Sequence, residues 1–304
     1  MWKFLKILLR SIITINYNCY LETCSFLDSI KKSLLPCSDY NYEVIVVDNA
    51  SIGNDVILLK EKYPWVKVIS SETNRGFSGG NNLGIANSSG NYYLFINNDV
   101  IIDYDIITPL LNRFHENDKT GVVTPKILDF ETRRIIYAGS KPLGSYLIRI
   151  HYYDDEISGS RSFSIPYAPG TAMLVKKEVV DRVGTWPELY FLYEEELDWC
   201  LNIGKYGYEI WYESKAFIYH KGSMTTGKNS PLVQYYTIRN RLLIFKRNLK
   251  GWHKYCSIVF TIGVSVPQKC LRYIFNHQYS LIRATLNGVS DFIRGTFYQR
   301  LKPF

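Results

Sequence analysis

Residues 42–51, YEVIVVDNAS, contain the pattern that decides the fold of this chain. Tyr42 to Val47 are nearly all apolar, as expected for a strand that is covered on both faces. The run ends at residues 48–51, a composition typical of a turn. An apolar run that ends at polar residues occurs in three further segments, Ile7–Ile15, Val66–Ser70 and Tyr92–Ile96.

Helical spacing separates these four runs. In residues 20–35 the apolar side chains recur every three or four positions, and shorter helices fit residues 56–63 and a segment that ends near Gly90. Strand and helix therefore alternate four times, which predicts an α/β fold with a mainly parallel, doubly wound sheet flanked by helices. Beyond Val122 we expect a short helix at 177–183 and short strands at 126–128, 134–138, 146–153, 164–167, 170–175, 208–212 and 216–219.

Polar residues follow all four predicted strands at their carboxyl ends, in residues 16–18, 48–51 and 97–99 and in the polar segment after Ser70. Ligands of doubly wound sheets bind beyond these ends, so we expect the four segments to line one crevice. Asp48 is as typical of a turn as of a ligand site. In a ligand site, its carboxylate would accept hydrogen bonds from the base or ribose of a nucleotide.

The loop from Asn74 to Gly84, NRGFSGGNNLG, contains four glycines and three asparagines and leads into a predicted helix. A glycine-rich loop alone is commonly only a turn. This one also contains Arg75 and exposed amides before a helix, a combination that favours an anion such as a diphosphate.

Two further residues are candidate metal ligands. Asp99 ends the segment after the fourth strand, where a polar turn is the simpler interpretation. Mg²⁺ or Mn²⁺ bound by phosphates needs few protein carboxylates, so Asp99 alone can suffice. His220 follows another predicted strand, and a lone histidine is more often structural. If it faces the same crevice, its nitrogen favours Mn²⁺ over Mg²⁺.

Residues 190–201, YFLYEEELDWCL, combine aromatic residues with an acidic helix start. Helical spacing places Leu197, Cys200, Leu201 and Gly204 on one face and Glu195, Asp198 and Asn202 on another. Acids in a first helical turn are commonly solvated and favoured by the helix dipole. Here the neighbouring aromatics would remove water from the carboxylates and raise the pKa of one toward the range of a general base.

The charge of the chain is unevenly distributed. The formal net charge is +8, but residues 239–304 carry twelve Lys and Arg and one acid, Asp291, so this tail is +11 and residues 1–238 are −3. The six cysteines show no metal-binding spacing, which predicts reduced thiols in a cytosolic protein. We expect no signal peptide and no membrane-spanning segment, because no apolar run reaches ~18 residues.

The tail, residues 239–304, is predicted to be a basic, aromatic, helical extension of a larger domain, residues 1–238. One interpretation is a helical cap on that domain. The other is an amphipathic segment on anionic lipid, with Trp252, Tyr255 and Phe260 at the interface. We expect no nucleic-acid partner, because the positive charge avoids the predicted crevice.

Taken in order, these segments resemble the family 2 glycosyltransferases of the GT-A fold, from Ile12 to Ser223. The resemblance covers IITINYN, VIVVDNAS, NRGFSGGNNLGI, YLFINNDV, GTAMLVKKEVVDRVG, FLYEEELDWCL and HKGS. Within the family it is most similar to the rhamnosyltransferase-like branch that assembles bacterial surface polysaccharides. The ordered combination is more specific than any single motif.

The resemblance implies a role for each site residue. Glu196 would be the catalytic base, with Glu195 orienting it or binding the acceptor. The nucleotide-sugar would contact Asn16, Asp48, Asn49, Ser51, Arg75, Gly76, Phe77, Asn81, Asn82 and Asn98. Asp99 matches the last acid of the metal-binding DxD motif, and His220 would complete a Mn²⁺ or Mg²⁺ site. Asn97 replaces the first DxD acid, which puts the dependence on metal in question.

The implied reaction is a single displacement with inversion at the anomeric carbon. The implied donor is a nucleotide-diphosphate sugar, with dTDP-rhamnose first to test. The acceptor is a glycan or a polyprenyl-diphosphate-linked sugar, which favours a cytoplasmic enzyme at the inner face of the plasma membrane. Two other functions stay open: a sugar nucleotidyltransferase, whose usual glycine- and lysine-rich first loop is missing here, and a non-catalytic glycan-binding protein.

Overall fold

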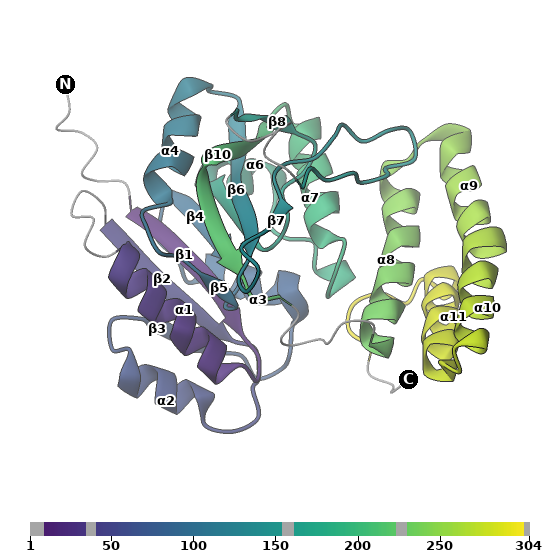
Figure 1. The fold of residues 1–304 in the computed structure, drawn as a ribbon, viewed down its shortest axis with the longest axis horizontal. Helices are drawn as coiled ribbons and strands as arrows, with labels where there is room; N and C mark the ends of the chain where they lie inside the picture. Colours follow the sequence, from purple (N-terminus) through teal and green to yellow (C-terminus); the bar gives the residue numbers. More distant parts are fainter. Residues whose placement is uncertain (1–8, 35–40, 154–160, 223–229, 301–304) are drawn as a thin grey trace.

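The computed structural model describes residues 9–34, 41–153, 161–222 and 230–300, and its centre is a 10-stranded sheet (Figure 1). The strand order is β3-β2-β1-β4-β9-β6-β10-β5, with β7 beside β6 and β8 beside β10. Ile7 and Ser223, which belong to segments discussed above, and Cys37, one of the six cysteines, lie outside the described residues.

The N-terminal half of the sheet is parallel and confirms the predicted alternation. It contains β1 (Leu9–Asn16), β2 (Asn41–Asp48), β3 (Lys67–Ser70) and β4 (Tyr92–Ile96), connected by α1 (Tyr20–Ser33), α2 (Asp55–Lys62) and α3 (Gly76–Ala86). The register places Asn16 opposite Asp48, and Asp48 opposite Ser70. Three strands therefore end level with one another, and their polar ends share one edge of the sheet.

The second half of the sheet is mixed. It contains β5 (Val100–Ile101), β6 (Thr120–Asp129), β7 (Ile135–Tyr137), β8 (Phe163–Ile165), β9 (Ala172–Lys176) and β10 (Glu209–His220). Strand β9 runs antiparallel between β4 and β6 and so joins the two halves. Helices α4 (Ile107–Glu116), α6 (Lys177–Val183) and α7 (Glu195–Lys205) and the 3₁₀ turn η2 (Glu188–Tyr190) complete this part.

Four of the predicted strands in this half differ in extent or existence from the structure. Residues 126–128 belong to the longer β6, and residues 208–212 and 216–219 form one strand, β10, because a register shift between Glu213 and Phe217 absorbs the polar interruption. The strand expected at 146–153 was wrong: in residues 140–153 the pairing is a single bridge, Ser140 with His151. Ile148 and Ile150 are exposed, so their alternation does not mark a buried strand face.

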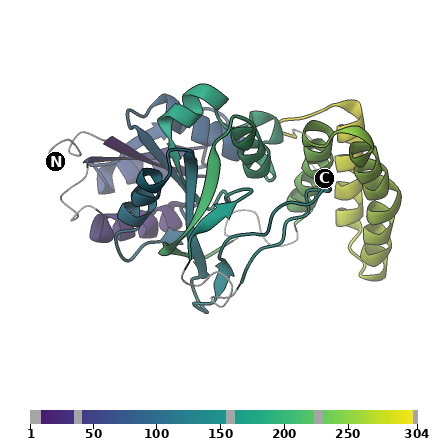
Figure 2. The same cartoon turned by 90° about the horizontal axis from the view of Figure 1, so that it is seen from above.

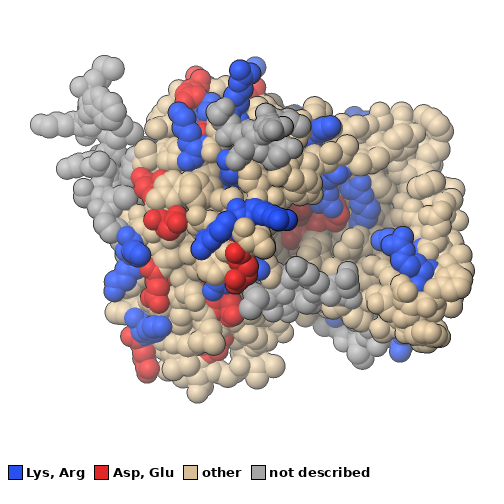
Figure 3. All heavy atoms as spheres, in the orientation of Figure 1, with Lys and Arg blue, Asp and Glu red and all other residues tan. Residues whose placement is uncertain are grey.

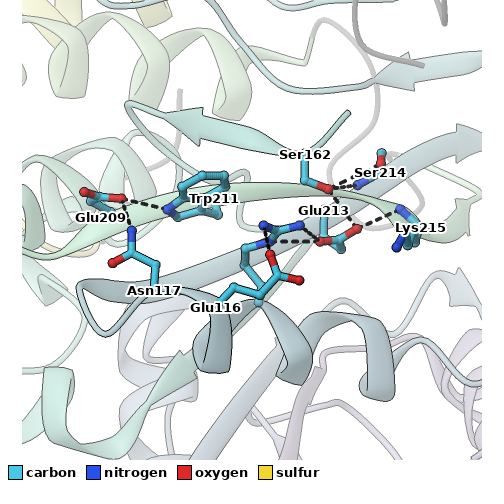
Figure 4. Close-up of polar contacts among 9 residues, drawn as sticks. Glu116, Asn117, Ser162, Glu209, Trp211, Glu213, Ser214 and Lys215 are labelled. Atoms are coloured by element: carbon cyan, nitrogen blue, oxygen red, sulfur yellow. Dashed lines mark hydrogen bonds and ion pairs between the residues drawn. The ribbon is translucent and has the colours of Figure 1, made fainter. Parts of the chain in front are cut away.

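A polar cluster fixes the interrupted part of β10 against α4 (Figure 4). The buried Glu213 carboxylate accepts hydrogen bonds from Arg113 Nη2 at 2.7 Å, Ser162 Oγ at 2.8 Å and the Lys215 amide at 3.0 Å. A buried charge is tolerated only when it is paired and hydrogen-bonded in this way. The cluster therefore holds the irregular strand that ends at His220.

The C-terminal region is helical, as predicted. Helices α8 (Pro231–Asn248), α9 (Gly251–Phe260), α10 (Val266–Phe275) and α11 (Tyr279–Arg294), with the π-helical turn η3 (Thr261–Ser265), form a layer beside the sheet (Figures 1 and 2). The boundary expected between residues 238 and 239 lies within α8. In the part of the chain that the structure describes, none of the helices combines the length and the apolar character needed to cross a membrane.

Candidate functional site

A cavity of about 450 Å³ lies at the carboxyl ends of the parallel strands. Its walls come from the ends of β1, β2 and β4, the start of α3, the loop before β9, the start of α7, the end of β10 and one residue of α8. The lining residues are Ile15, Tyr17, Asn49, Asn74, Gly76, Phe77, Asn81, Ile96, Asn97, Asn98, Asp99, Pro169, Gly170, Thr171, Phe191, Leu192, Tyr193, Glu195, Glu196, His220 and Leu232. The polar strand ends thus converge on one crevice, as the topology predicts.

The predicted nucleotide residues divide into two groups. Asn49, Gly76, Phe77, Asn81 and Asn98 line the cavity. The others are not among the lining residues, and they are Asn16, Asp48, Ser51, Arg75 and Asn82.

Asn16 is the centre of a buried polar network behind the cavity wall. Its amide donates to Asp48 Oδ2 at 2.8 Å, to Ser51 Oγ at 3.1 Å and to Asp55 Oδ2 at 2.9 Å. Asp48 Oδ1 accepts in turn from the Ser51 amide at 3.0 Å, and Asp48 is 1% exposed. Such a network fixes the strand ends that carry the lining residues.

Asn49 connects this network to the glycine-rich loop. Its Nδ2 donates to Gly76 O at 3.0 Å and to Asn74 Oδ1 at 3.1 Å, and its Oδ1 accepts from the Arg75 amide at 2.9 Å. One asparagine side chain therefore shapes the turn that starts α3. Arg75 is not among the lining residues, and its Nη2 lies 3.7 Å from the carboxylate of Glu188.

Asn82 packs against the turn η2. Its Nδ2 donates to Trp186 O and to Glu188 Oε1, both at 2.9 Å, and its Oδ1 accepts from the Trp186 amide at 3.0 Å. Asn82 and Arg75 thus share Glu188 as a partner and tie α3 to the segment before the acidic helix.

Gly76 is the point of closest approach between the glycine-rich loop and the acidic stretch. It has φ +69°, and a Cβ on it would lie 2.2 Å from Phe191 O. Phe191 O accepts a hydrogen bond from the Phe77 amide at 2.7 Å. Only glycine allows both the left-handed backbone and this contact.

Asp99 and His220 face each other across the cavity floor. Asp99 Oδ1 lies 3.2 Å from His220 Nε2, and Asp99 is 9% exposed. Asp99 Oδ1 is buried and makes no hydrogen bond within the described residues. Two ligands in adjacent positions of an octahedral ion, at about 2.1 Å each, stand about 3 Å apart, so this pair fits one divalent cation. The described residues contain no cluster of three or more His, Cys, Asp and Glu that could hold a metal ion.

The acidic helix start is buried rather than solvated. Glu194, Glu195 and Asp198 are each less than 5% exposed, and the Glu196 side chain is 17% exposed. In the orientation of Figure 1, Figure 3 shows acidic atoms deep in a hollow between the sheet and the helical tail, with basic atoms beside them. The interpretation as ordinary surface acids is therefore excluded for these residues.

Burial is the main cause of altered acidity here. It raises the pKa of Glu195 well above the ordinary value, and the neighbouring charge of Glu196 adds to this rise. Burial also raises the pKa of Glu196, although the guanidinium of Arg149 opposes the shift. A carboxylate with a raised pKa, open to the cavity, is suited to accept a proton.

Arg149 is a site residue that the sequence did not indicate. Its Nη1 lies 3.2 Å from Glu196 Oε1, and its Nη2 pairs with Glu194 Oε1 at 2.5 Å. It lies in the extended segment after β7, which reaches across to the helical tail (Figures 1 and 2). Arg241 of α8 approaches Glu194 Oε2 at 3.7 Å. The sequence indicates only that buried acids need basic partners. No pattern in it shows which arginine or lysine pairs with Glu194 and Glu196.

The comparisons with known sequences agree with the geometry. The sequence model described as glycosyl transferase family 2 matches residues 11–184, more than half of the chain. The chain is 27% identical over 180 residues to "Low-salt glycan biosynthesis hexosyltransferase Agl10" of Haloferax volcanii, which covers 54% of this chain and 56% of that protein. It is 24% identical over 306 residues to "dTDP-rhamnosyl transferase RfbF" of Shigella flexneri, covering 93% of this chain and 99% of that one.

Some of the matches to curated relatives cover only part of each relative. The chain spans about half the length of the curated relatives Agl10 and the poly-beta-1,6-N-acetyl-D-glucosamine synthase of Staphylococcus epidermidis, at 56% and 47%.

Solved structures share the fold. GalNAc-T7 with UDP, GalNAc and Mn²⁺ superposes with a TM-score of 0.67 at 15% identity, covering 94% of this chain and 57% of that one. S. aureus TarS 1–349 with UDP-GlcNAc superposes with a TM-score of 0.55 at 18% identity, covering 95% and 93%.

Proposed function

The chain belongs to glycosyl transferase family 2 and has the GT-A fold, and on this basis we propose that it is an inverting glycosyltransferase. It would move a sugar from a nucleotide-diphosphate donor to a hydroxyl group of a glycan or lipid-linked acceptor. One observation carries the proposal: the nucleotide residues Asn49 and Phe77, the pair Asp99 and His220, and the acid Glu196 all line a single cavity.

The nucleotide would lie over the ends of β1 and β2, with its diphosphate near the start of α3. Asn49, Asn81 and Phe77 are among the residues that line the cavity. dTDP-rhamnose is the first donor to test, since the relative that matches nearly the whole chain is described as a dTDP-rhamnosyl transferase.

Asp99 and His220 would hold a divalent cation, and the histidine nitrogen favours Mn²⁺ over Mg²⁺. Such an ion, when bound, offsets the charge that grows on a leaving diphosphate. The support for this proposal is the spacing of the two side chains, with Asp99 Oδ1 lying 3.2 Å from His220 Nε2.

Glu196 would accept the proton of the acceptor hydroxyl as that oxygen attacks the anomeric carbon. Glu195 lies beside it and is more deeply buried, and burial raises its pKa well above the ordinary value. Its protonated form would donate a hydrogen bond to the acceptor or to Glu196. A single base and no separate nucleophile predict inversion at the anomeric carbon.

The test is turnover of a panel of nucleotide-sugars with Mn²⁺, with product and donor anomers compared by NMR. We expect one donor to be consumed with inversion, and Glu196→Gln to slow transfer about 1000-fold while Glu178→Gln, a surface change on α6, leaves the rate unchanged. Retention of anomeric configuration, or turnover by Glu196→Gln at the wild-type rate, would contradict the proposal.

The helical tail would rest on anionic lipid, which places the enzyme at the inner face of the plasma membrane near a polyprenyl-diphosphate-linked acceptor. Its outer surface exposes large apolar side chains without an acid among them: Trp252, Tyr255, Val259, Phe260, Leu271, Ile274 and Phe275. Apolar and basic residues together favour an anionic membrane surface. The division into residues 1–238 and 239–304 stays a prediction.

Co-sedimentation with vesicles containing anionic lipid tests this contact. We expect the wild type to bind them and Trp252→Ser with Phe260→Ser to bind at least several-fold less. Leu21→Ser, which changes an equally exposed apolar residue on α1, is the matched control and should bind as the wild type does. Equal binding by all three proteins would contradict membrane contact through the tail.

A further inference from the structure

The loop between η2 and α7 has an unusual backbone. Phe191, Tyr193 and Glu194 have φ values of +64°, +68° and +72°, and none of them is glycine. Side chains make this left-handed region unfavourable, so three such residues within four positions persist only when surrounding contacts hold them. The loop ends directly at Glu195 and Glu196, so its conformation sets where both acids point.

Asn240 of α8 holds this loop from one side. The residue is fully buried, and its Nδ2 lies 3.0 Å from Tyr190 O, 2.7 Å from Leu192 O and 2.8 Å from Tyr193 O. One side-chain amide group therefore donates hydrogen bonds to three backbone carbonyls in and next to the strained loop. Buried carbonyls need such partners, so the contact fixes the path of the loop.

Arg239, the residue before Asn240, fixes the orientation of this amide. Arg239 Nε donates to Asn240 Oδ1 at 2.9 Å, which turns the Asn240 amino group toward the loop. Arg239 also donates to Tyr190 O at 2.7 Å and to Tyr298 O at 2.8 Å, and it is fully buried. Arg239 thus joins the loop, α8 and the C-terminal segment after α11.

The start of α3 holds the loop from the opposite side. The Phe77 amide donates to Phe191 O. Because Gly76 has no side chain, the two segments approach so closely that a Cβ on it would lie 2.2 Å from Phe191 O. The Phe191 ring stacks on Tyr236 of α8, with ring centroids 5.3 Å apart. The strained loop is therefore clamped between the glycine-rich loop and the helical tail.

We propose that Arg239 and Asn240 are positioning residues that place the catalytic acids, and that the tail therefore completes the active site. The expected effect on kcat rests on the proposed function. The holding of the strained loop by α8 is independent of that function.

The test compares Asn240→Ala with Asn248→Ala. Asn248 lies two turns further along α8, and its Nδ2 donates to Asp198 Oδ1 of α7 at 2.5 Å. Its removal therefore weakens the contact between α8 and α7 but removes no hydrogen bond to the loop. For Asn240→Ala we expect kcat to fall roughly 100-fold, the loss that a displacement of about 1 Å can cause. KM for the donor should change less than threefold. Asn248→Ala should keep kcat within threefold of the wild type.

Hydrogen–deuterium exchange of residues 189–200 provides a readout that needs no activity. We expect at least tenfold faster exchange in this segment for Asn240→Ala, and unchanged exchange for Asn248→Ala. Asn240→Asp keeps the volume and removes the donors, so it serves as a second variant if the alanine variant does not fold. A kcat within threefold of the wild type in folded Asn240 variants, an equal loss in both alanine variants, or failure of both Asn240 variants to fold would overturn the proposal.

The two hypotheses fail in different ways. A wild-type protein that consumes no nucleotide-sugar would contradict the proposed function. Unchanged exchange of residues 189–200 in folded Asn240→Ala would contradict the positioning role, whatever the donor.

Discussion

The two sides of the cavity are built in opposite ways. The side proposed to bind the nucleotide, called the nucleotide side below, consists of strand ends and the loop that follows β3. Its hydrogen bonds join segments that neighbour each other in the sheet, such as Asn16 with Asp48. The acid side is held by distant segments: Arg149 reaches it from the loop after β7, and Asn240 from α8. The first side depends on topology and the second on tertiary packing, so they should respond differently to substitution.

The largest expected effect lies on the acid side. Glu196→Gln removes the proposed base while keeping its shape, and a general base contributes roughly 10²–10⁴-fold to rate. We expect kcat to fall about 1000-fold with donor affinity unchanged, because the nucleotide side is separate. Donor binding by calorimetry and kcat from product formation check this, and a loss of donor affinity equal to the loss of rate would contradict the separation.

Gly76→Ala tests the point where the two sides meet. The added Cβ would lie 2.2 Å from Phe191 O, on a residue with positive φ, so we expect a loss of about 3 kcal/mol in the free energy of unfolding. Gly53→Ala is the matched control, because Gly53 also has positive φ but no atom within 4 Å of the added Cβ. It should lose only about 1 kcal/mol in urea denaturation. Equal losses would show that the contact with Phe191 contributes nothing.

Arg149→Met tests the electrostatic part of the acid side. The base must be deprotonated, so activity rises with pH through the pKa of Glu196, and Arg149 holds that pKa down. Its removal should move the acidic limb of the kcat profile to higher pH and lower the rate at pH 7 by about tenfold. Arg182→Met, an exposed change on α6, should leave the profile unchanged. An unshifted acidic limb for Arg149→Met would show that the guanidinium does not act on the base.

The smallest effect concerns stability. The folded-state pKa of Glu195 is raised, so its contribution to stability is fully present below the unfolded pKa and is lost as pH rises through the folded value. The side chain in Glu195→Gln does not ionise, so the variant does not lose this stability as the pH rises. The variant should therefore be more stable than the wild type by of the order of 1 kcal/mol at pH 8, with the difference vanishing near pH 4. Melting temperatures across this range measure it, and a pH-independent difference would contradict the assignment.

The sequence predicted the strand ends that line one side of the cavity, because their determinants are local. Apolar runs and the polar residues after them indicated β1, β2 and β4 with the segments that line the cavity, and the parallel pairing followed from the alternation with helices. The same patterns placed Asp99, Glu196 and His220 at element ends that converge. Asp48 and Asn16 were indicated as ligand contacts, and the structure places them behind the wall, because their side chains satisfy one another.

The acid side could not be predicted in full, for a physical reason. Arg149 lies in a segment without regular pairing, and its apolar neighbours are exposed, so no periodicity marks it. Asn240 and Arg239 lie within an apparently ordinary basic helix, and the sequence places them only one residue inside the tail. Their function depends on three carbonyls some 50 positions earlier in the chain. Contacts of this kind leave no local pattern.

A crystal structure with the nucleoside diphosphate of the donor and Mn²⁺ bound would show whether nucleotide, ion and catalytic acid share this cavity. We expect the ion on Asp99 and His220, the nucleoside over the ends of β1 and β2, and the terminal phosphate of the diphosphate directed toward Glu196. A diphosphate bound elsewhere, or one directed away from Glu196, would contradict it.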